Sequence, residues 1–475
     1  MELGGKATDF PTAQLFLLAT PLGGDTHLLA LGLCRIAEPV ALTSPLPYAY
    51  DLMEHLLGNS TTNAAFYAGL FVAAFSLTET LTGFWWGALS DRMGRKPVLL
   101  LGCAGTILSL LVLGFSMNIW MAILGRALGG ALNGNVGVVQ TMVGEMVTRP
   151  EHEARAYAVI PFFFSVGCTI GPALGGLLAQ QTLGGSAIFL KFPYLLPNIA
   201  CAGMVLTTMV LASLALDETH PDLRKQPLGE MGSSQHPDHG EDAPLLPPAA
   251  GSTNGPAHAG SLWDLNTNVK MLIAAVCLLS AHTVTYIQLL PIFLRSPRDH
   301  SVPPYYIGGI GGLDMSLSEV GLVMGVNGII GLGIQLVFPV FTGWFGLKTT
   351  LLMMTSLHPI AYFCLPYLPF LPASTWRVGL WTWLVARNIL STFTYPALLI
   401  LIKRWTPNTL ILGRVNGLVA SAGAACRTVS PAAAGLLQSI GENHHVSALA
   451  WWGSGVFALI AAIQSWFIRF DGVPN

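Results

Sequence analysis

The sequence predicts an all-α membrane protein with twelve transmembrane helices in two pseudo-symmetric six-helix bundles. Composition is the first observation, since 52% of the 475 residues are hydrophobic and 10% are charged. Soluble domains carry about 25% charged residues, so most of this surface must face lipid. The second observation is the length of the apolar stretches, about 20 residues each, which is what one helix needs to cross a bilayer. The third is an internal repeat on either side of a polar segment.

The apolar stretches do not alternate with polar residues, so they indicate helices rather than barrel strands. We expect transmembrane helices over residues 27–50, 64–89, 97–116, 118–141, 153–180, 193–216, 267–293, 318–344, 347–368, 376–402, 413–438 and 447–470. The segment 217–262 is rich in proline and acidic residues, cannot bury a core, and predicts a flexible cytosolic linker. It separates an N-terminal half, 27–216, from a C-terminal half, 263–475. A short cytosolic lead-in covers 1–26.

The distribution of lysine and arginine predicts the orientation of the chain. With the N-terminus in the cytosol, fourteen of these residues fall on the cytosolic side and four on the other. Both termini are therefore expected in the cytosol. The triplet Asn59-Ser60-Thr61 then lies on the opposite side, as a glycosylation site or as a chance match. Linker residues 241–246 are similar to an acidic dileucine sorting signal, so we expect either a vacuolar or endosomal membrane or the plasma membrane.

Several classes of function lack their sequence requirements. The net charge is −2 and no basic tract occurs, so nucleic acid is not an expected partner. The seven cysteines lie in apolar stretches without a CxxC pair, and the linker histidines are irregularly spaced. We interpret these as packing and solvated residues rather than metal ligands. Neither HExxH nor G-x-x-x-x-G-K-[ST] occurs, so we expect no enzyme and no ATP site. The expected protein is a monomer without a cofactor, driven by an ion gradient.

Matching residues in the fifth and eleventh spans support an internal duplication. Arg155 precedes Pro172 by 17 residues, and Arg414 precedes Pro431 by the same 17. Gly171, Gly175 and Gly176 lie around Pro172, and Gly435 follows Pro431. Such agreement at corresponding spans predicts that the two halves share one architecture.

The most specific motif is the decapeptide 87–96, Gly-Ala-Leu-Ser-Asp-Arg-Met-Gly-Arg-Lys, which follows the second span. An ordinary basic cytosolic loop is the alternative, but all ten positions in this order disfavour it. The decapeptide resembles the loop signature G-x-L-[AS]-D-[RK]-x-G-R-[KR] of the major facilitator superfamily, through Gly87, Asp91, Arg92, Gly94, Arg95 and Lys96. This resemblance implies a cytosolic latch between the halves, with Glu145 as a charge partner. The corresponding loop of the second half, 343–348, lacks the aspartate, so the latch should be one-sided.

A second motif lies in the fifth span, at Gly167, Gly171, Pro172, Gly175 and Gly176. Proline removes a backbone donor and kinks the helix, and glycines four residues apart allow another helix to approach closely. Simple helix packing is the alternative interpretation. The segment also resembles the G-x-x-x-G-P-x-x-G-G antiporter motif of the superfamily, which implies proton-coupled export.

Charged residues within spans are costly and therefore suggest function. Our candidates for proton coupling are Glu38, Glu79 and Arg126. Arg126 resembles the fourth-helix arginine that the superfamily uses in proton transfer. The alternative for Glu38 is a structural ion pair with Arg35, one helical turn away. We interpret Arg387 and Arg427 as structural partners.

Polar side chains in the fourth and seventh spans predict a central cavity. The candidates for substrate contact are Asn133, His282, Tyr286 and Gln288. His282 has a second interpretation, a hydrogen-bonded packing residue.

Segments 34–39 and 416–435 resemble the zinc-induced-facilitator-like and tetracycline-exporter-like branch of the superfamily, especially its fungal members. This does not identify zinc as a substrate. The combined prediction is a proton-coupled antiporter that exports a small organic molecule by alternating access, as multidrug efflux proteins do. A uniporter or importer and a non-transporting nutrient sensor are the alternatives. We expect coupling chemistry mainly in the N-terminal half and substrate choice mainly in the C-terminal half.

Overall fold

The computed structural model describes residues 25–58, 63–135, 138–139, 141–142, 150–181, 186–219, 266–298, 303, 306–372, 374–406 and 409–470. Within these ranges the chain is helical, and one isolated bridge between Arg298 and Gly311 is its only β-type pairing. The Asn59 triplet, the dileucine segment and Glu145 lie outside the described residues.

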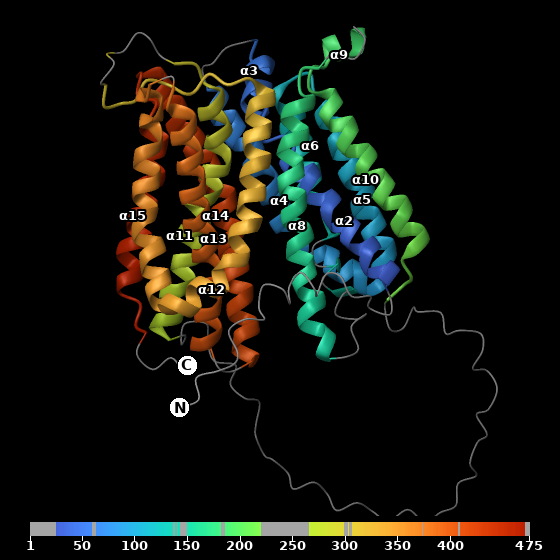
Figure 1. Cartoon of the computed structure of the whole chain (residues 1–475). Helices are drawn as coiled ribbons and strands as arrows, with labels where there is room; N and C mark the ends of the chain where they lie inside the picture. The colour runs from blue at the N-terminus through green and yellow to red at the C-terminus, as the bar shows by residue number, and fades with distance from the viewer. Residues whose placement is uncertain are drawn as a thin grey trace, which may run out of the picture.

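The helices form two bundles that stand side by side (Figure 1). The N-terminal bundle contains α2 (Asp25–Thr43), α3 (Ala49–Leu56), α4 (Ala64–Met93), α5 (Arg95–Gly114), α6 (Ile119–Ala131), α8 (Pro150–Leu178), α9 (Ala187–Lys191) and α10 (Leu195–Ala215). The C-terminal bundle contains α11 (Thr267–Arg295), α12 (Leu317–Cys364), the 3-10 helix η3 (Leu365–Phe370), α13 (Trp376–Trp405), α14 (Thr409–Asn443) and α15 (Leu449–Trp466). These bounds follow the apolar stretches closely. By length and composition, seven of the described helical segments could cross a membrane, which is consistent with twelve spans.

Helix α12 combines two of the predicted spans. They meet at Gly346, where φ is 75° and ψ is 159°, a backbone conformation outside the helical region. Glycine adopts it without a steric penalty because it has no Cβ atom. The degenerate loop of the second half is therefore a one-residue break instead of an extended turn.

The fourth span is interrupted, although the sequence predicted one helix over 118–141. Helix α6 ends at Ala131, and residues 132–134 are not helical. The Trp86 indole donates to the Ala131 carbonyl at 2.7 Å, and the Thr78 hydroxyl donates to the Ala127 carbonyl at 2.8 Å. Irregular backbone within a membrane is tolerated where it is buried in protein or lines a cavity, and these two donors satisfy carbonyls at the helix end.

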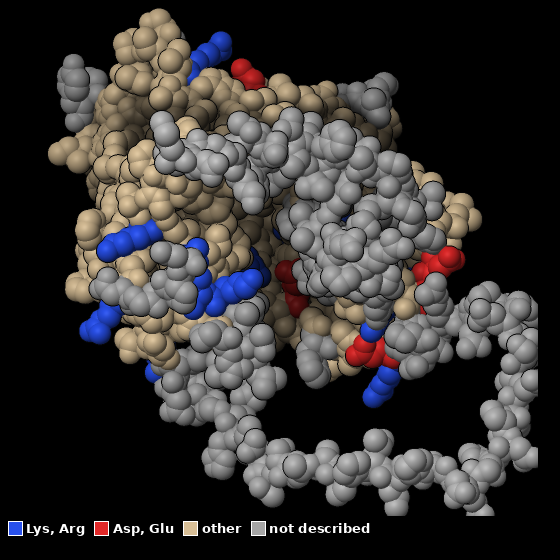
Figure 2. Space-filling model, turned by 60° about the horizontal axis from the view of Figure 1, so that its bottom comes forward, with Lys and Arg blue, Asp and Glu red and all other residues tan. Residues whose placement is uncertain are grey.

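The described close contacts between the bundles are concentrated toward one end of the molecule. We call the end that holds residues 87–96 the motif side, and the end that holds α3 and α9 the opposite side (Figure 1). On the opposite side, Gly176 packs against Gly321, and Gly435 packs against Ala65. A buried apolar cluster there is shared by both bundles. On the motif side, Figure 2 shows a hollow between the halves with acidic side chains inside it. The described structure is thus open toward the motif side.

Two polar contacts across the halves also lie on the opposite side. The Arg295 Nε atom donates to the Asp51 carboxylate at 3.0 Å, and the Phe66 backbone N–H donates to the Ser439 hydroxyl at 3.2 Å. The Asp51 side chain is only 8% exposed, whereas that of Arg295 is 34% exposed. This ion pair has to break if the opposite side opens.

Candidate transport site

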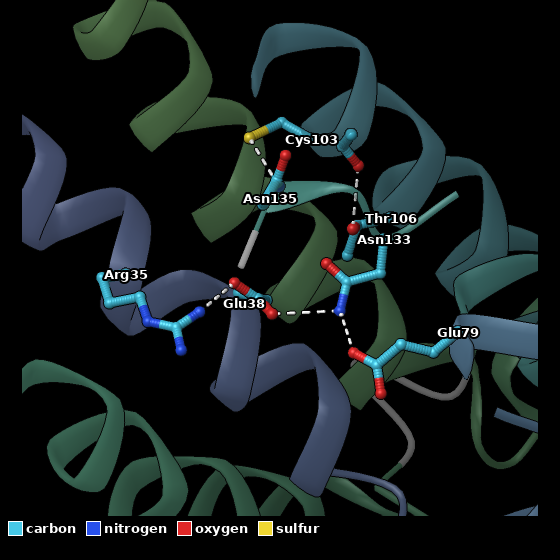
Figure 3. Close-up of polar contacts among 8 residues, drawn as sticks. Arg35, Glu38, Glu79, Cys103, Thr106, Asn133 and Asn135 are labelled. Atoms are coloured by element: carbon cyan, nitrogen blue, oxygen red, sulfur yellow. Dashed lines mark hydrogen bonds and ion pairs between the residues drawn. The ribbon is translucent and has the colours of Figure 1, made fainter. Parts of the chain in front are cut away.

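A charged network occupies the interior of the N-terminal bundle (Figure 3). Arg35 and Glu38 lie one turn apart on α2, and the guanidinium donates to the carboxylate at 2.7 Å. Both side chains are less than 10% exposed. The ion pair considered from the sequence therefore exists. Its remaining carboxylate oxygen is free for another donor.

Asn133 joins this ion pair to a second carboxylate. Its amide nitrogen donates to Glu38 at 3.0 Å and to Glu79 on α4 at 2.9 Å. Asn133 reaches both because it lies in the non-helical break after α6, where the backbone is not held in the helical direction. Figure 3 shows the two carboxylates on either side of the amide. The sequence grouped Asn133 with the substrate cavity, but the structure places it between two of the residues predicted for proton coupling.

Arg126 is buried deeper in the same bundle. Its guanidinium lies 5.0 Å from the ring centres of both Phe71 and Phe75 and donates to the Leu42 carbonyl at 3.1 Å. Arg126 and Glu38 line the same small cavity with Asn133. The interior of the N-terminal half thus holds two carboxylates and two arginines, of which Arg35 is hydrogen-bonded to the network and Arg126 lines the cavity beside it.

The antiporter motif on α8 packs against α2, the helix that carries Arg35 and Glu38. Gly167, Gly171 and Gly175 lie against α2, so close that a Cβ atom at any of them would collide with that helix. Gly176 faces the other half instead, at Gly321 of α12. The motif therefore brings α2, which carries Arg35 and Glu38, into close contact with α8, and it also forms part of the seam between the halves.

The described contacts of the motif loop lie within its own half. Arg95 donates to the Asp91 carboxylate at 2.6 Å and to the Ser90 hydroxyl at 2.7 Å. Among the described residues, the exposed Arg92 makes no hydrogen bond that positions the loop, and no atom lies within 4 Å of the Cβ position of Gly87. Gly94 has a φ of +97°, which favours glycine, and it begins the turn into α5.

Glu218 is a partner of this loop that the sequence analysis missed. Its carboxylate accepts hydrogen bonds from the backbone N–H groups of Arg95 at 2.8 Å and Lys96 at 3.2 Å. It thereby satisfies the free donors at the start of α5, where the helix dipole also favours an anion. The Lys96 ammonium donates to the Ser213 carbonyl on α10 at 2.8 Å. The sequence feature that could have indicated this contact is an acidic residue shortly after the sixth predicted span.

The cavity candidates of the C-terminal half separate into two groups. His282 is 2% exposed, and its ring nitrogen lies 2.9 Å from the Tyr362 hydroxyl, with the His358 ring tilted against it. This group points into the bundle. Tyr286 lies beneath the Arg387 guanidinium, 3.4 Å from its ring centre. Gln288 reaches the N-terminal half at Gly69.

Two helical bundles that meet around charged residues within the membrane define an integral, multi-pass membrane transporter. The chain belongs to the Major Facilitator Superfamily, whose family model matches residues 40–386. The family resemblance seen in the sequence is confirmed, and this family consists of transporters rather than enzymes.

Named relatives agree with this assignment. The major facilitator superfamily multidrug transporter mfsB of Aspergillus fumigatus is 33% identical, over 97% of this chain and 84% of that protein. Protein ZINC INDUCED FACILITATOR-LIKE 1 of Arabidopsis thaliana is 26% identical, over 89% of this chain and 86% of that protein. A bacterial homologue of the human lysosomal transporter Spinster, solved in an inward-facing and occupied conformation, has a TM-score of 0.67 at 13% identity. It covers 93% of this chain and 96% of its own, and it shows the fold.

Proposed function

We propose that this transporter exports a small organic molecule from the cytosol in exchange for protons. The observation that carries the proposal is the Asn133 amide, which holds Glu38 and Glu79 together inside the membrane. A carboxylate in this setting can take up and release a proton, and a proton on one carboxylate changes the hydrogen bonds of the other. The intact antiporter motif and the multidrug relative mfsB support export.

In this proposal the motif side faces the cytosol, so the described structure is the cytosol-open state. Lysine and arginine are concentrated on that side. Substrate enters the hollow between the halves, and protons reach Glu79 when the opposite side opens. Exchange is compatible with alternating access, in which the two halves open only one end at a time.

The test uses the purified protein in liposomes that contain a pH-sensitive dye and a panel of cationic, neutral and anionic fluorescent compounds. We expect concentrative flux of at least one compound, accompanied by proton movement in the opposite direction. Glu79→Gln should reduce proton movement per transported molecule at least tenfold, whereas Asp314→Asn, an exposed carboxylate on the opposite side, should leave it within twofold.

Three results would contradict the proposal. Concentrative transport that continues after the proton gradient is collapsed would exclude proton coupling. Flux down a gradient without proton movement would identify a uniporter. Ligand binding without any flux would identify a sensor.

A further inference from the structure

The two halves differ in their balance of charge within the membrane. In the N-terminal half, Arg35 is paired with Glu38, and Arg126 lines a cavity that also contains Glu38. In the C-terminal half, the sequence has no aspartate or glutamate from residue 320 to residue 441. Of the five arginines in that interval, Arg387 and Arg427 lie near the middle of α13 and α14. Arg427 is exposed and interacts electrostatically with Glu79 of the other half.

Arg387 has no such partner among the described residues. It is 4% exposed, and its Nε and Nη2 atoms are buried without a hydrogen-bond acceptor. Its contacts are with aromatic groups: the guanidinium lies flat on the Tyr286 ring, and the Tyr362 hydroxyl is beside it. A buried charge without a hydrogen-bonded counterpart is strongly unfavourable. Two parallel N–H donors on one guanidinium are the arrangement that matches the two oxygens of a carboxylate.

The surroundings of Arg387 place it near the seam between the halves. Asn388, its neighbour on α13, donates to the backbone and side-chain oxygens of Asn327 on α12, each at 2.9 Å. Gly328, the next residue of α12, lies against Thr169 of the N-terminal half. The amide of Gln288, two residues after Tyr286 on α11, is also buried without partners. Polar groups from three helices therefore converge where the two halves meet.

We infer that Arg387, with Tyr286 and Gln288, binds the acid group of the transported molecule. The expected ligand is an organic anion whose carboxylate or similar oxyanion takes the two free N–H groups of Arg387. This inference builds on the proposed export function and names its substrate class. Because the anion binds to the C-terminal half and the proton to the N-terminal half, the two do not compete for one group. Exchange then requires that they favour opposite-facing states.

The test measures binding by thermal unfolding of the full-length protein, with benzoate, benzamide and benzylammonium as probes of one shape and different charge. We expect benzoate to raise the unfolding temperature of the wild type in a concentration-dependent way, and the other two to have less than a tenth of its affinity. Arg387→Gln should weaken benzoate binding at least tenfold. Arg377→Gln is the matched control, since Arg377 also stacks on an aromatic ring of α13 but is exposed at its end, and benzoate affinity should stay within twofold.

Arg387→Lys keeps the charge and loses the paired donors, so it should bind benzoate at least fivefold more weakly. If the Arg387→Gln variant does not fold, the Arg387→Lys variant alone tests the inference. Equal affinity in that lysine variant would overturn the paired-donor geometry. Equal shifts with benzoate and benzamide would overturn anion recognition, and equal shifts with benzoate and chloride would assign the site to an inorganic anion instead. The assay needs no proton gradient, so its outcome is independent of whether transport is coupled to protons.

Discussion

Asn133 is the residue on which the candidate coupling site depends. An amide nitrogen carries two N–H groups and can therefore serve two carboxylates at once. Glu38 uses its other oxygen for Arg35, so Asn133 links a fixed ion pair to the more accessible Glu79. A change at Glu79 can pass to α2 through this single side chain.

Replacing Asn133 with leucine removes both donors at similar volume. Each hydrogen bond to a charged group is worth about 1.5–3 kcal/mol. We expect proton-driven transport in liposomes to fall about tenfold or more, with the protein still monodisperse on gel filtration. Asn135→Ser is the control, because the Asn135 amide contacts Cys103 instead of a carboxylate. A similar loss in both variants would mean that the break itself, not the bridge, is essential.

At the scale of helices, the apolar stretches and motifs predicted most of the elements. The predicted spans coincide with the helices because length and hydrophobicity alone decide which segments enter a bilayer. The break at 132–134 could not be predicted, because it depends on Trp86 and Thr78, which satisfy the carbonyls at the end of α6. The bridge by Asn133 follows from that break and was missed for the same reason. Glu218 was missed because its partners lie more than 120 residues away in the sequence.

Glu218 gives a prediction for the start of α5. Glu218→Gln removes the negative charge from the helix N-terminus, and Glu218→Ala also removes both acceptors. Such end interactions contribute about 0.5–2 kcal/mol. We expect the alanine variant to lower the unfolding free energy by about 1 kcal/mol and the glutamine variant by less. Amide hydrogen exchange should rise at residues 94–98 in both. If exchange there is unchanged while stability falls, Glu218 acts elsewhere.

At the scale of the whole molecule, the seam on the opposite side depends on small residues. Gly435 contacts the Ala65 carbonyl of α4 so closely that an added side chain has no room. Gly69 lies equally close to the Pro431 carbonyl. Side chains at these positions would hold the halves apart on the opposite side.

Gly435→Val should therefore favour opening of the opposite side and reduce transport at least tenfold. A membrane-impermeant maleimide should label a cysteine introduced at Ser439 faster in this variant than in the wild-type background. Gly203→Val is the matched control, since Gly203 lies on an exposed face of α10 with no atom within reach of its Cβ position. Transport reduced to the same extent by the control would indicate a general effect of valine on folding.

In the proposed alternating-access cycle, the partly exposed ion pair between Asp51 and Arg295 affects the relative populations of the two states. A partly exposed pair contributes on the order of 1 kcal/mol, which corresponds to about a fivefold change in a two-state population. In the proposed cycle, a bound proton or substrate has to outweigh this ion pair and the close packing of the seam for the opposite side to open. The population of the described state should therefore fall as the ionic strength on the opposite side rises, because salt screens the ion pair.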